Sequence, residues 1–203
     1  MSPNSVENLA AAIAVVGPVV DGVRDDQWSA ATPCGDWSVR QLTDHVVSGD
    51  RLFATILSGT PMPPPEELRR RAAEDHLGSR PSAAYREAAR ELLAAFELPG
   101  VLDEVHGFPV GPLPGRAAIQ LRTVETLVHG WDLATATGQQ LPASADSLAE
   151  RVLGFSRQLL TRIPEDRRPF GPPCPASDDA PALGRLLALL GREPGVQIGG
   201  RSS

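Results

Sequence analysis

The sequence predicts an all-α fold, a four-helix bundle with an extra C-terminal helix and long loops rich in proline and glycine. Apolar residues recur at the three- and four-residue spacing of amphipathic helices in several separate segments. Proline and glycine, 20 and 19 of the 203 residues, fall largely between those segments. The one strand candidate is a short stretch at about 101–110, which we expect to form a hairpin or an extended lid.

The first two helices are expected over residues 4–23 and 39–58. In the first, the Gly-Pro pair at 17–18 predicts a kink or an early end, because proline lacks the N–H that an interior helical position donates. The second is introduced by Ser38 and Gln41, which stand at the spacing of a capping box. Its start at the residue after Ser38 is therefore well defined by the sequence.

Five further helices follow the same apolar periodicity. The first is a short surface helix, and the last is a short docking helix rich in leucine. In chain order they are expected over residues 66–77, 81–97, 115–138, 142–162 and 182–190.

We expect a single domain, because 203 residues suit one core with some appended segments. Residues 1–163 form the helical bundle in this interpretation. Residues 164–203 form a proline-rich connection, the short docking helix and a frayed tail of the same domain.

Composition excludes several classes of function. The net charge of −6, without a block of like charge, argues against a nucleic-acid partner. No apolar run approaches the roughly 20 residues that span a bilayer, and no signal peptide is evident. Cys34 and Cys174 are too few and too far apart in the sequence to indicate a disulfide framework. A cytoplasmic protein, monomeric or homodimeric, is expected.

Three residues suggest a metal site. Glu125 and His129 are one turn apart on the 115–138 helix, at the border of its apolar stripe. His45 lies within the apolar arc of the 39–58 helix, where its ring needs a polar partner. Two histidines and one carboxylate leave a coordination position open, as in catalytic zinc sites, although Ni²⁺, Fe²⁺ and Co²⁺ also suit these ligands. A core histidine bonded to the backbone or to a neighbouring glutamate explains the same spacing equally well.

Asp132, Arg122 and Cys34 are further candidates for the site. Asp132 falls on the side of Glu125 and is interpreted as a hydrogen-bond acceptor behind a ligand, as a substrate contact or as a simple ion-pair residue. Arg122 is either a contact for an anionic substrate or, as we expect, a solvated side chain. Cys34 either approaches the metal, is redox-active or, as we expect, packs as a small loop residue under Trp37.

Three stretches carry a resemblance to a known superfamily. Residues 32–46, TPCGDWSVRQLTDHV, resemble the N-terminal signature of the DinB-like, mycothiol-dependent maleylpyruvate isomerase superfamily. Residues 124–138, VETLVHGWDLATATG, resemble its second signature. Residues 186–194, LLALLGREP, are similar to the tail of a short actinobacterial branch of metal-binding proteins in that superfamily.

The resemblance implies a DinB-like bundle and a divalent metal, typically zinc, bound by a His, Glu, His triad. Those roles fall on His45, Glu125 and His129 here. It also implies an isomerase or S-transferase in which the metal activates a low-molecular-weight thiol, mycothiol, or a small electrophilic substrate. The full-length isomerases carry a further C-terminal α/β domain, which we expect this chain to lack. A metal-dependent hydrolase and a non-catalytic metal-binding or sensing bundle are the alternatives.

Overall fold

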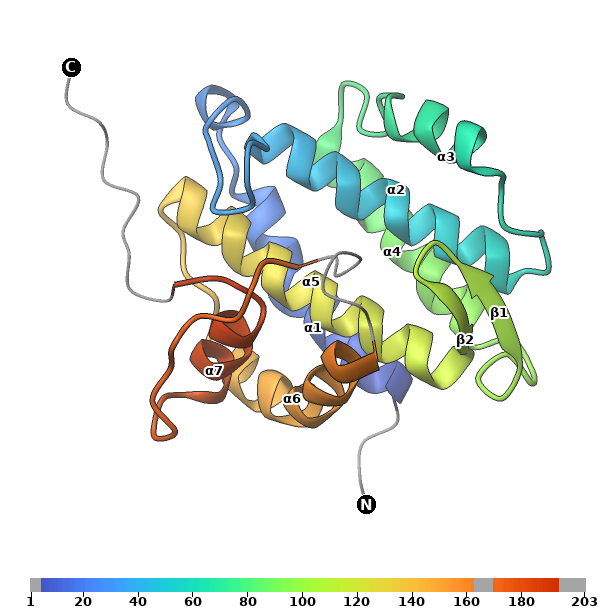
Figure 1. Ribbon diagram of the computed structural model, residues 1–203. Helices are drawn as coiled ribbons and strands as arrows, with labels where there is room; N and C mark the ends of the chain where they lie inside the picture. The colour runs from blue at the N-terminus through green and yellow to red at the C-terminus, as the bar shows by residue number, and fades with distance from the viewer. Residues whose placement is uncertain (1–4, 163–169, 194–203) are drawn as a thin grey trace.

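The computed structural model describes residues 5–162 and 170–193. Within these ranges the chain forms seven α-helices, a single turn of 3₁₀-helix and one two-stranded hairpin (Figure 1). The expected boundary between 163 and 164 and most of the expected frayed tail, residues 194–203, lie outside the described residues.

Four helices form the bundle, which confirms the predicted fold class. They are α1 (Ser5–Asp21), α2 (Val39–Leu57), α4 (Pro81–Phe96) and α5 (Gly115–Thr137). The α1 helix packs on α5 and α4, while α2 packs on α4 and α5 (Figure 1). Because α5 contributes buried residues along nearly its whole length, polar side chains on it reach the interior of the molecule.

The α1 helix does not end at Gly17-Pro18. It continues to Asp21, because Val15, Val16 and their neighbours on the next turn are buried against the core and hold the backbone in register. The α1 and α5 backbones come very close to each other beside Val16. A Cβ atom built on Gly130 would lie 2.2 Å from Cγ2 of Val16, so the contact requires glycine at this point.

The capping box predicted at the start of α2 is present. The Ser38 hydroxyl accepts a hydrogen bond from the Gln41 N–H, and the Gln41 side chain accepts one from the Ser38 N–H at 2.9 Å. This fixed start sets which α2 side chains face α5, and therefore where His45 points.

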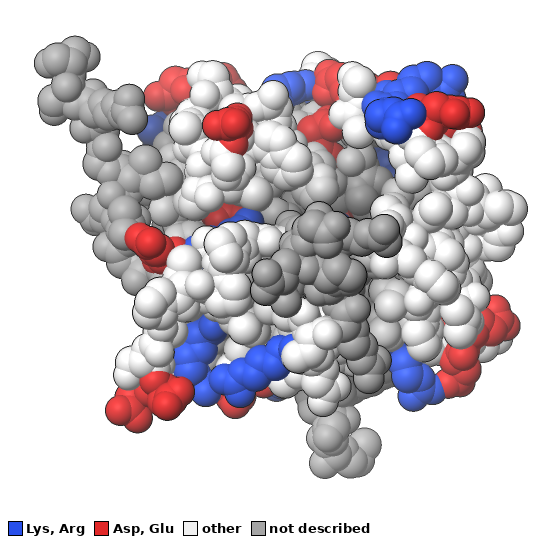
Figure 2. All heavy atoms as spheres, in the orientation of Figure 1, with Lys and Arg blue, Asp and Glu red and all other residues white. Residues whose placement is uncertain are grey.

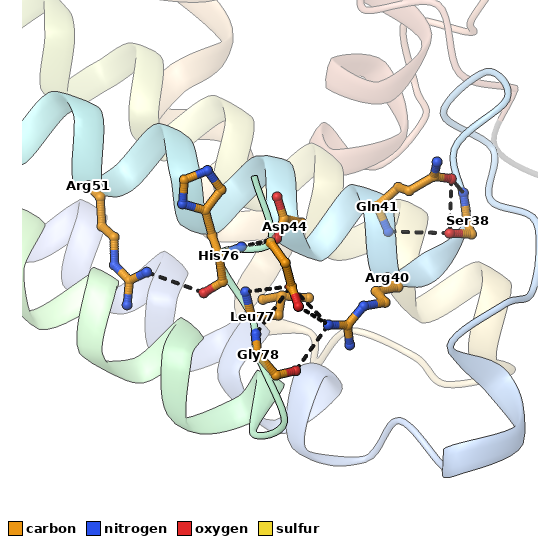
Figure 3. A network of polar contacts seen from close by, with 9 residues as sticks. Ser38, Arg40, Gln41, Asp44, Arg51, His76, Leu77 and Gly78 are labelled. Carbon is orange, nitrogen blue, oxygen red and sulfur yellow. Dashed lines mark hydrogen bonds and ion pairs between the residues drawn. The ribbon is translucent and has the colours of Figure 1, made fainter. Parts of the chain in front are cut away.

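The helix expected over 66–77 is shorter in the structure. The α3 helix spans Pro65–Ala72, and the chain then turns toward α2. The turn is stabilised by carboxylates that satisfy its backbone: His76 N–H donates to Asp44 Oδ1 at 2.7 Å, and Asp75 accepts two further N–H groups (Figure 3). These acceptors compete with continuation of the helix. The connection is thus tied to α2 at Asp44, the residue before His45.

The hairpin lies further along the chain than the expected 101–110. It pairs β1 (Val105–Phe108) with β2 (Gly111–Pro114), and the turn between them contains Pro109. Gly111 has a φ of 109°, a conformation open to glycine, which explains why the second strand begins there. Phe108 stacks on Phe53 of α2 with 4.3 Å between ring centroids and holds the hairpin against the bundle.

The last two helices cover the far side of α5. The α6 helix (Ser144–Arg162) packs on α5 and α1, and α7 (Ala182–Leu189) packs on α6. In the described part of the chain, no helix has both the length and the apolar character needed to cross a bilayer. On the face drawn in Figure 2, cationic and anionic side chains are scattered among uncharged ones, with a mixed cluster over α3 at the upper right.

Candidate metal centre

The structure brings together the two histidines predicted as ligands. His45 on α2 and His129 on α5 face each other with 5.3 Å between ring centroids and an 87° angle between ring planes. Two imidazoles bound to one tetrahedral zinc at about 2.1 Å have centroids roughly 5 Å apart. The spacing of the two rings therefore fits a shared metal ion.

His45 is suited to be a neutral ligand. Its ring packs 4.6 Å from that of Trp37, and no described residue hydrogen-bonds to its ring nitrogens. Burial, followed by the neighbouring His129, lowers the pKa of His45 to about 4. The imidazole is then unprotonated at neutral pH, which is the form that coordinates a metal.

Glu125 offers one carboxylate oxygen to the same region. Its Oε2 accepts a hydrogen bond from Nη1 of Arg122, whereas no described residue bonds to Oε1. The charge of Glu125 acts on both His45 and His129, which places the carboxylate near the two rings. Because one oxygen is anchored and the other is unengaged, the side chain fits a monodentate ligand.

Arg122 is buried, so the expectation of a solvated side chain is wrong. Its guanidinium lies between Asp50 of α2 and Glu125, with Nε donating to Asp50 Oδ1 at 3.1 Å. Gly49 makes room for it, since a Cβ at that position would lie 3.0 Å from Nη1. Both carboxylates supply the counter-charge that a guanidinium needs in the core, and the pKa of Arg122 is raised despite burial.

A hydrogen-bonded carboxylate orients His129. Nδ1 of the ring is 3.2 Å from Oδ2 of Asp132, which is fully buried. Burial alone would lower the pKa of His129, but hydrogen bonds with Asp132 and Cys34 outweigh burial and raise it to about 8. At that pKa the metal-free ring is mostly protonated at neutral pH, and a metal ion would have to displace the proton on Nε2. With the remaining proton on Nδ1, the ring presents the lone pair of Nε2 for coordination. Asp132 therefore contacts the ring of His129, and its role behind a metal ligand stays a prediction.

A second group of potential ligands shares His129. Ligand atoms of Cys34, His129 and Asp132 all lie within 4.8 Å of one another, which makes them a candidate metal site. However, Arg192 donates to Cys34 Sγ at 3.2 Å and to both carboxylate oxygens of Asp132. A cation already bound to two of the three donors opposes a metal ion at the same place. On the His45 side the neighbouring cation is Arg122, which is bonded to one oxygen of Glu125 and leaves the other oxygen without a partner among the described residues.

A cleft of about 900 Å³ opens beside His45 and Glu125. Its walls come from α2, the α3 region, α4, α5 and the tip of the hairpin. His76, which was not predicted as part of the site, also lines the cleft, and Asp44 holds the turn that carries it (Figure 3). The lining of the cleft includes His45 and Glu125 but not His129.

The comparisons with known proteins agree with this fold. Residues 9–134 match the family model of the mycothiol maleylpyruvate isomerase N-terminal domain. The chain belongs to this family. Two uncharacterized proteins from strains of Mycobacterium tuberculosis are each 32% identical to it over 170 residues, which cover 84% of this chain and 87% of theirs.

Two solved structures have the same bundle. They are the mycothiol-dependent maleylpyruvate isomerase and a mutant of it, with TM-scores of 0.56 and 0.59 and 13% sequence identity. Each match covers 71% of this chain and 66% of the isomerase chain. The chain therefore spans just under two thirds of the isomerase, and at this identity the likeness concerns the fold.

Two charged residues of the centre were not predicted as part of it. Asp50 is an acidic residue on the buried face of α2, and that position is the one signal that could have identified it. Arg192 lies well beyond the matched family region, 9–134, and in a tail expected to be frayed. No spacing rule connects it to α5, because the chain between them folds as two helices and a long connection.

Proposed function

We propose that this family member binds a divalent metal, zinc in the first instance, through His45, Glu125 and His129. We further propose that it uses the metal in thiol-dependent chemistry on a small electrophile. The observation that carries the proposal is the 5.3 Å approach of the His129 ring to the ring of His45, which lines the cleft together with Glu125. Mycothiol is the first thiol to test, because the solved relatives are named for their dependence on it.

A bound zinc ion would lower the pKa of a thiol coordinated at the open position and so favour the nucleophilic thiolate. The protein's own residues set up that position. Burial keeps His45 neutral. Arg122 holds Oε2 of Glu125 and leaves Oε1 without a partner among the described residues. Asp132 accepts from Nδ1 of His129 and leaves Nε2 for coordination. The cleft admits the thiol and the electrophile from the α2 side.

Metal content tests the ligand set directly. Protein purified without chelator is analysed by elemental analysis as wild type, His45→Ala and His76→Ala. His76 is a matched control because it is another partly buried histidine on the cleft wall, bonded through its ring to the backbone of Arg71. We expect about one metal per chain in the wild type and the control, and much less in His45→Ala. Full retention of metal in His45→Ala would refute the triad.

Turnover tests the chemistry. Metal-loaded protein is incubated with mycothiol and a panel of small electrophiles, with and without a chelator. Thiol-dependent consumption of an electrophile that stops on chelation is the expected result. Consumption that needs metal but no thiol would contradict the thiol step and favour a hydrolase using activated water. Metal binding without turnover of any substrate would count for a non-catalytic bundle.

A further inference from the structure

Arg192 reaches the candidate centre from the opposite end of the chain. It follows α7, and its guanidinium is buried against α5. Nη2 donates to Oδ2 of Asp132 at 2.9 Å and Nε approaches Oδ1 at 3.3 Å, so the two groups meet through two nitrogens and two oxygens. Such paired contacts fix the plane of a carboxylate as well as its position.

The Asp132 carboxylate depends on this contact. It is fully buried, and its hydrogen-bond partners among the described residues are Arg192 and His129. The same Oδ2 accepts from Arg192 and faces Nδ1 of His129. Without the guanidinium, the buried carboxylate would lose its counter-charge and the paired contacts that fix its plane. A rotated carboxylate would no longer face Nδ1 of His129.

We infer that Arg192 is a positioning residue of the metal centre, which acts through Asp132 to hold His129 with Nδ1 protonated and Nε2 presented to the metal. The inference rests on the proposed function for the role of the metal, but the effect on the His129 tautomer does not need a metal. It makes the segment after α7 part of the site, although the segment lies outside the matched family region, 9–134.

Cys34 belongs to the same arrangement. Its Sγ accepts from Nη2 of Arg192 at 3.2 Å, so the arginine also joins the loop before α2 to α5. The single guanidinium therefore links three parts of the chain around His129: the loop that leads to His45, the α5 helix and the C-terminal segment.

The test replaces Arg192 by Met, which keeps most of the apolar stem and removes the charge, and by Lys, which keeps the charge but not the paired contact. Arg185→Met is the matched control. Arg185 holds the α7 helix, which precedes Arg192, through an exposed contact with Glu150 of α6 at 2.6 Å. Circular dichroism melting establishes that each variant is folded before it is used.

Two quantities are measured. Zinc affinity is obtained by competition with a chromophoric chelator. The tautomer of His129 is obtained from long-range ¹H–¹⁵N correlation spectra of metal-free protein at about pH 9, where the ring is neutral. We expect Arg192→Met to weaken zinc binding by about 10- to 100-fold and to reduce the Nδ1–H population. Arg192→Lys should keep part of the zinc affinity and part of the Nδ1–H population, and Arg185→Met should match the wild type in both quantities.

Wild-type zinc affinity together with an unchanged tautomer in Arg192→Met would overturn the inference. An equal loss in Arg185→Met would also overturn it, because the arginine would then act only by docking the segment. If Arg192→Met does not fold, Arg192→Lys decides, and wild-type values in that variant refute the positioning role. If the wild type binds no zinc, the proposed function fails, while the tautomer still tests Arg192 by itself.

Discussion

Replacing Gly130 by Ala should destabilise the protein, although alanine is the better helix former. A Cβ at position 130 would lie 2.2, 3.0 and 3.2 Å from Cγ2, Cγ1 and Cβ of Val16. Carbon atoms in contact normally stand about 3.5–4.0 Å apart. Rotating Val16 gives no relief, because β-branched side chains in helices have essentially one χ1 rotamer and all three Val16 atoms are already too close. The α1 and α5 helices must therefore separate by roughly 1 Å.

The magnitude follows from two opposing terms. Alanine instead of glycine in a helix interior gains about 1 kcal/mol. Forcing an extra methyl group into a packed core costs about 1–3 kcal/mol, and the short distances here place Gly130→Ala at the upper end. We expect a net loss of about 2 kcal/mol in the free energy of unfolding. The shift should also weaken metal binding, since Gly130 is the neighbour of His129.

Urea titration followed by circular dichroism measures this loss. Gly154→Ala is the control: it lies inside α6, and nothing is within 4 Å of its added Cβ, so this variant should be stabilised by up to about 1 kcal/mol. In a double-mutant cycle, Val16→Ala should be less destabilising when combined with Gly130→Ala, with a coupling of about 1–2 kcal/mol. An increase in stability of Gly130→Ala equal to that of Gly154→Ala would refute the packing argument.

Two further predictions concern the charged groups of the centre. Arg122→Met should lower the free energy of unfolding, measured by urea titration, by about 3–5 kcal/mol, because it leaves Asp50 charged and unpaired in the core. Adding Asp50→Asn to the same chain should recover part of this loss. A double variant as unstable as Arg122→Met would contradict the pairing. In metal-free protein, stability should be greatest near pH 6.5, the ordinary pKa of histidine. Below pH 6.5 the free energy of unfolding should fall as pH falls toward 4, because the folded state disfavours the protonation of His45, whose folded-state pKa is about 4. Above pH 6.5 the free energy of unfolding should fall as pH rises to 8, because the folded state favours the protonated form of His129, whose folded-state pKa is about 8. Urea midpoints across this range measure both limbs, and an unchanged acid limb in His45→Ala would argue against the first.

Most of the fold could be predicted because its signals are local. The capping box fixes the start of α2, and the apolar stripes of α4 and α5 place them within a residue or two of their observed bounds. The errors occurred where a distant contact overrides local preference. The burial of Val15 and Val16 carries α1 through Pro18, and Asp44 draws the residues after α3 into a turn.

The candidate site, like the fold, could be predicted from the sequence only in part. His45 and His129 could be brought together from helical periodicity and the resemblance, and the structure places their rings in contact. The environment of Arg122 could not be foreseen. Arginine is usually solvated, whereas in the structure Asp50 of α2 and the space beside Gly49 admit the Arg122 side chain to the core. An acidic residue on the buried face of α2 indicates that a partner is needed, but the pairing of Asp50 with Arg122 depends on how the two helices pack.

The contact of Arg192 with Cys34 joins residues 158 positions apart in the sequence. Such a contact exists only in the completely folded chain, since its entropic cost must be met by the rest of the structure. Binding at the site and folding of the molecule are consequently linked equilibria. A ligand present at a free concentration of 100 times its dissociation constant would add about 2.7 kcal/mol to the free energy of unfolding. Metal supply could then compensate for a destabilising substitution anywhere in the bundle.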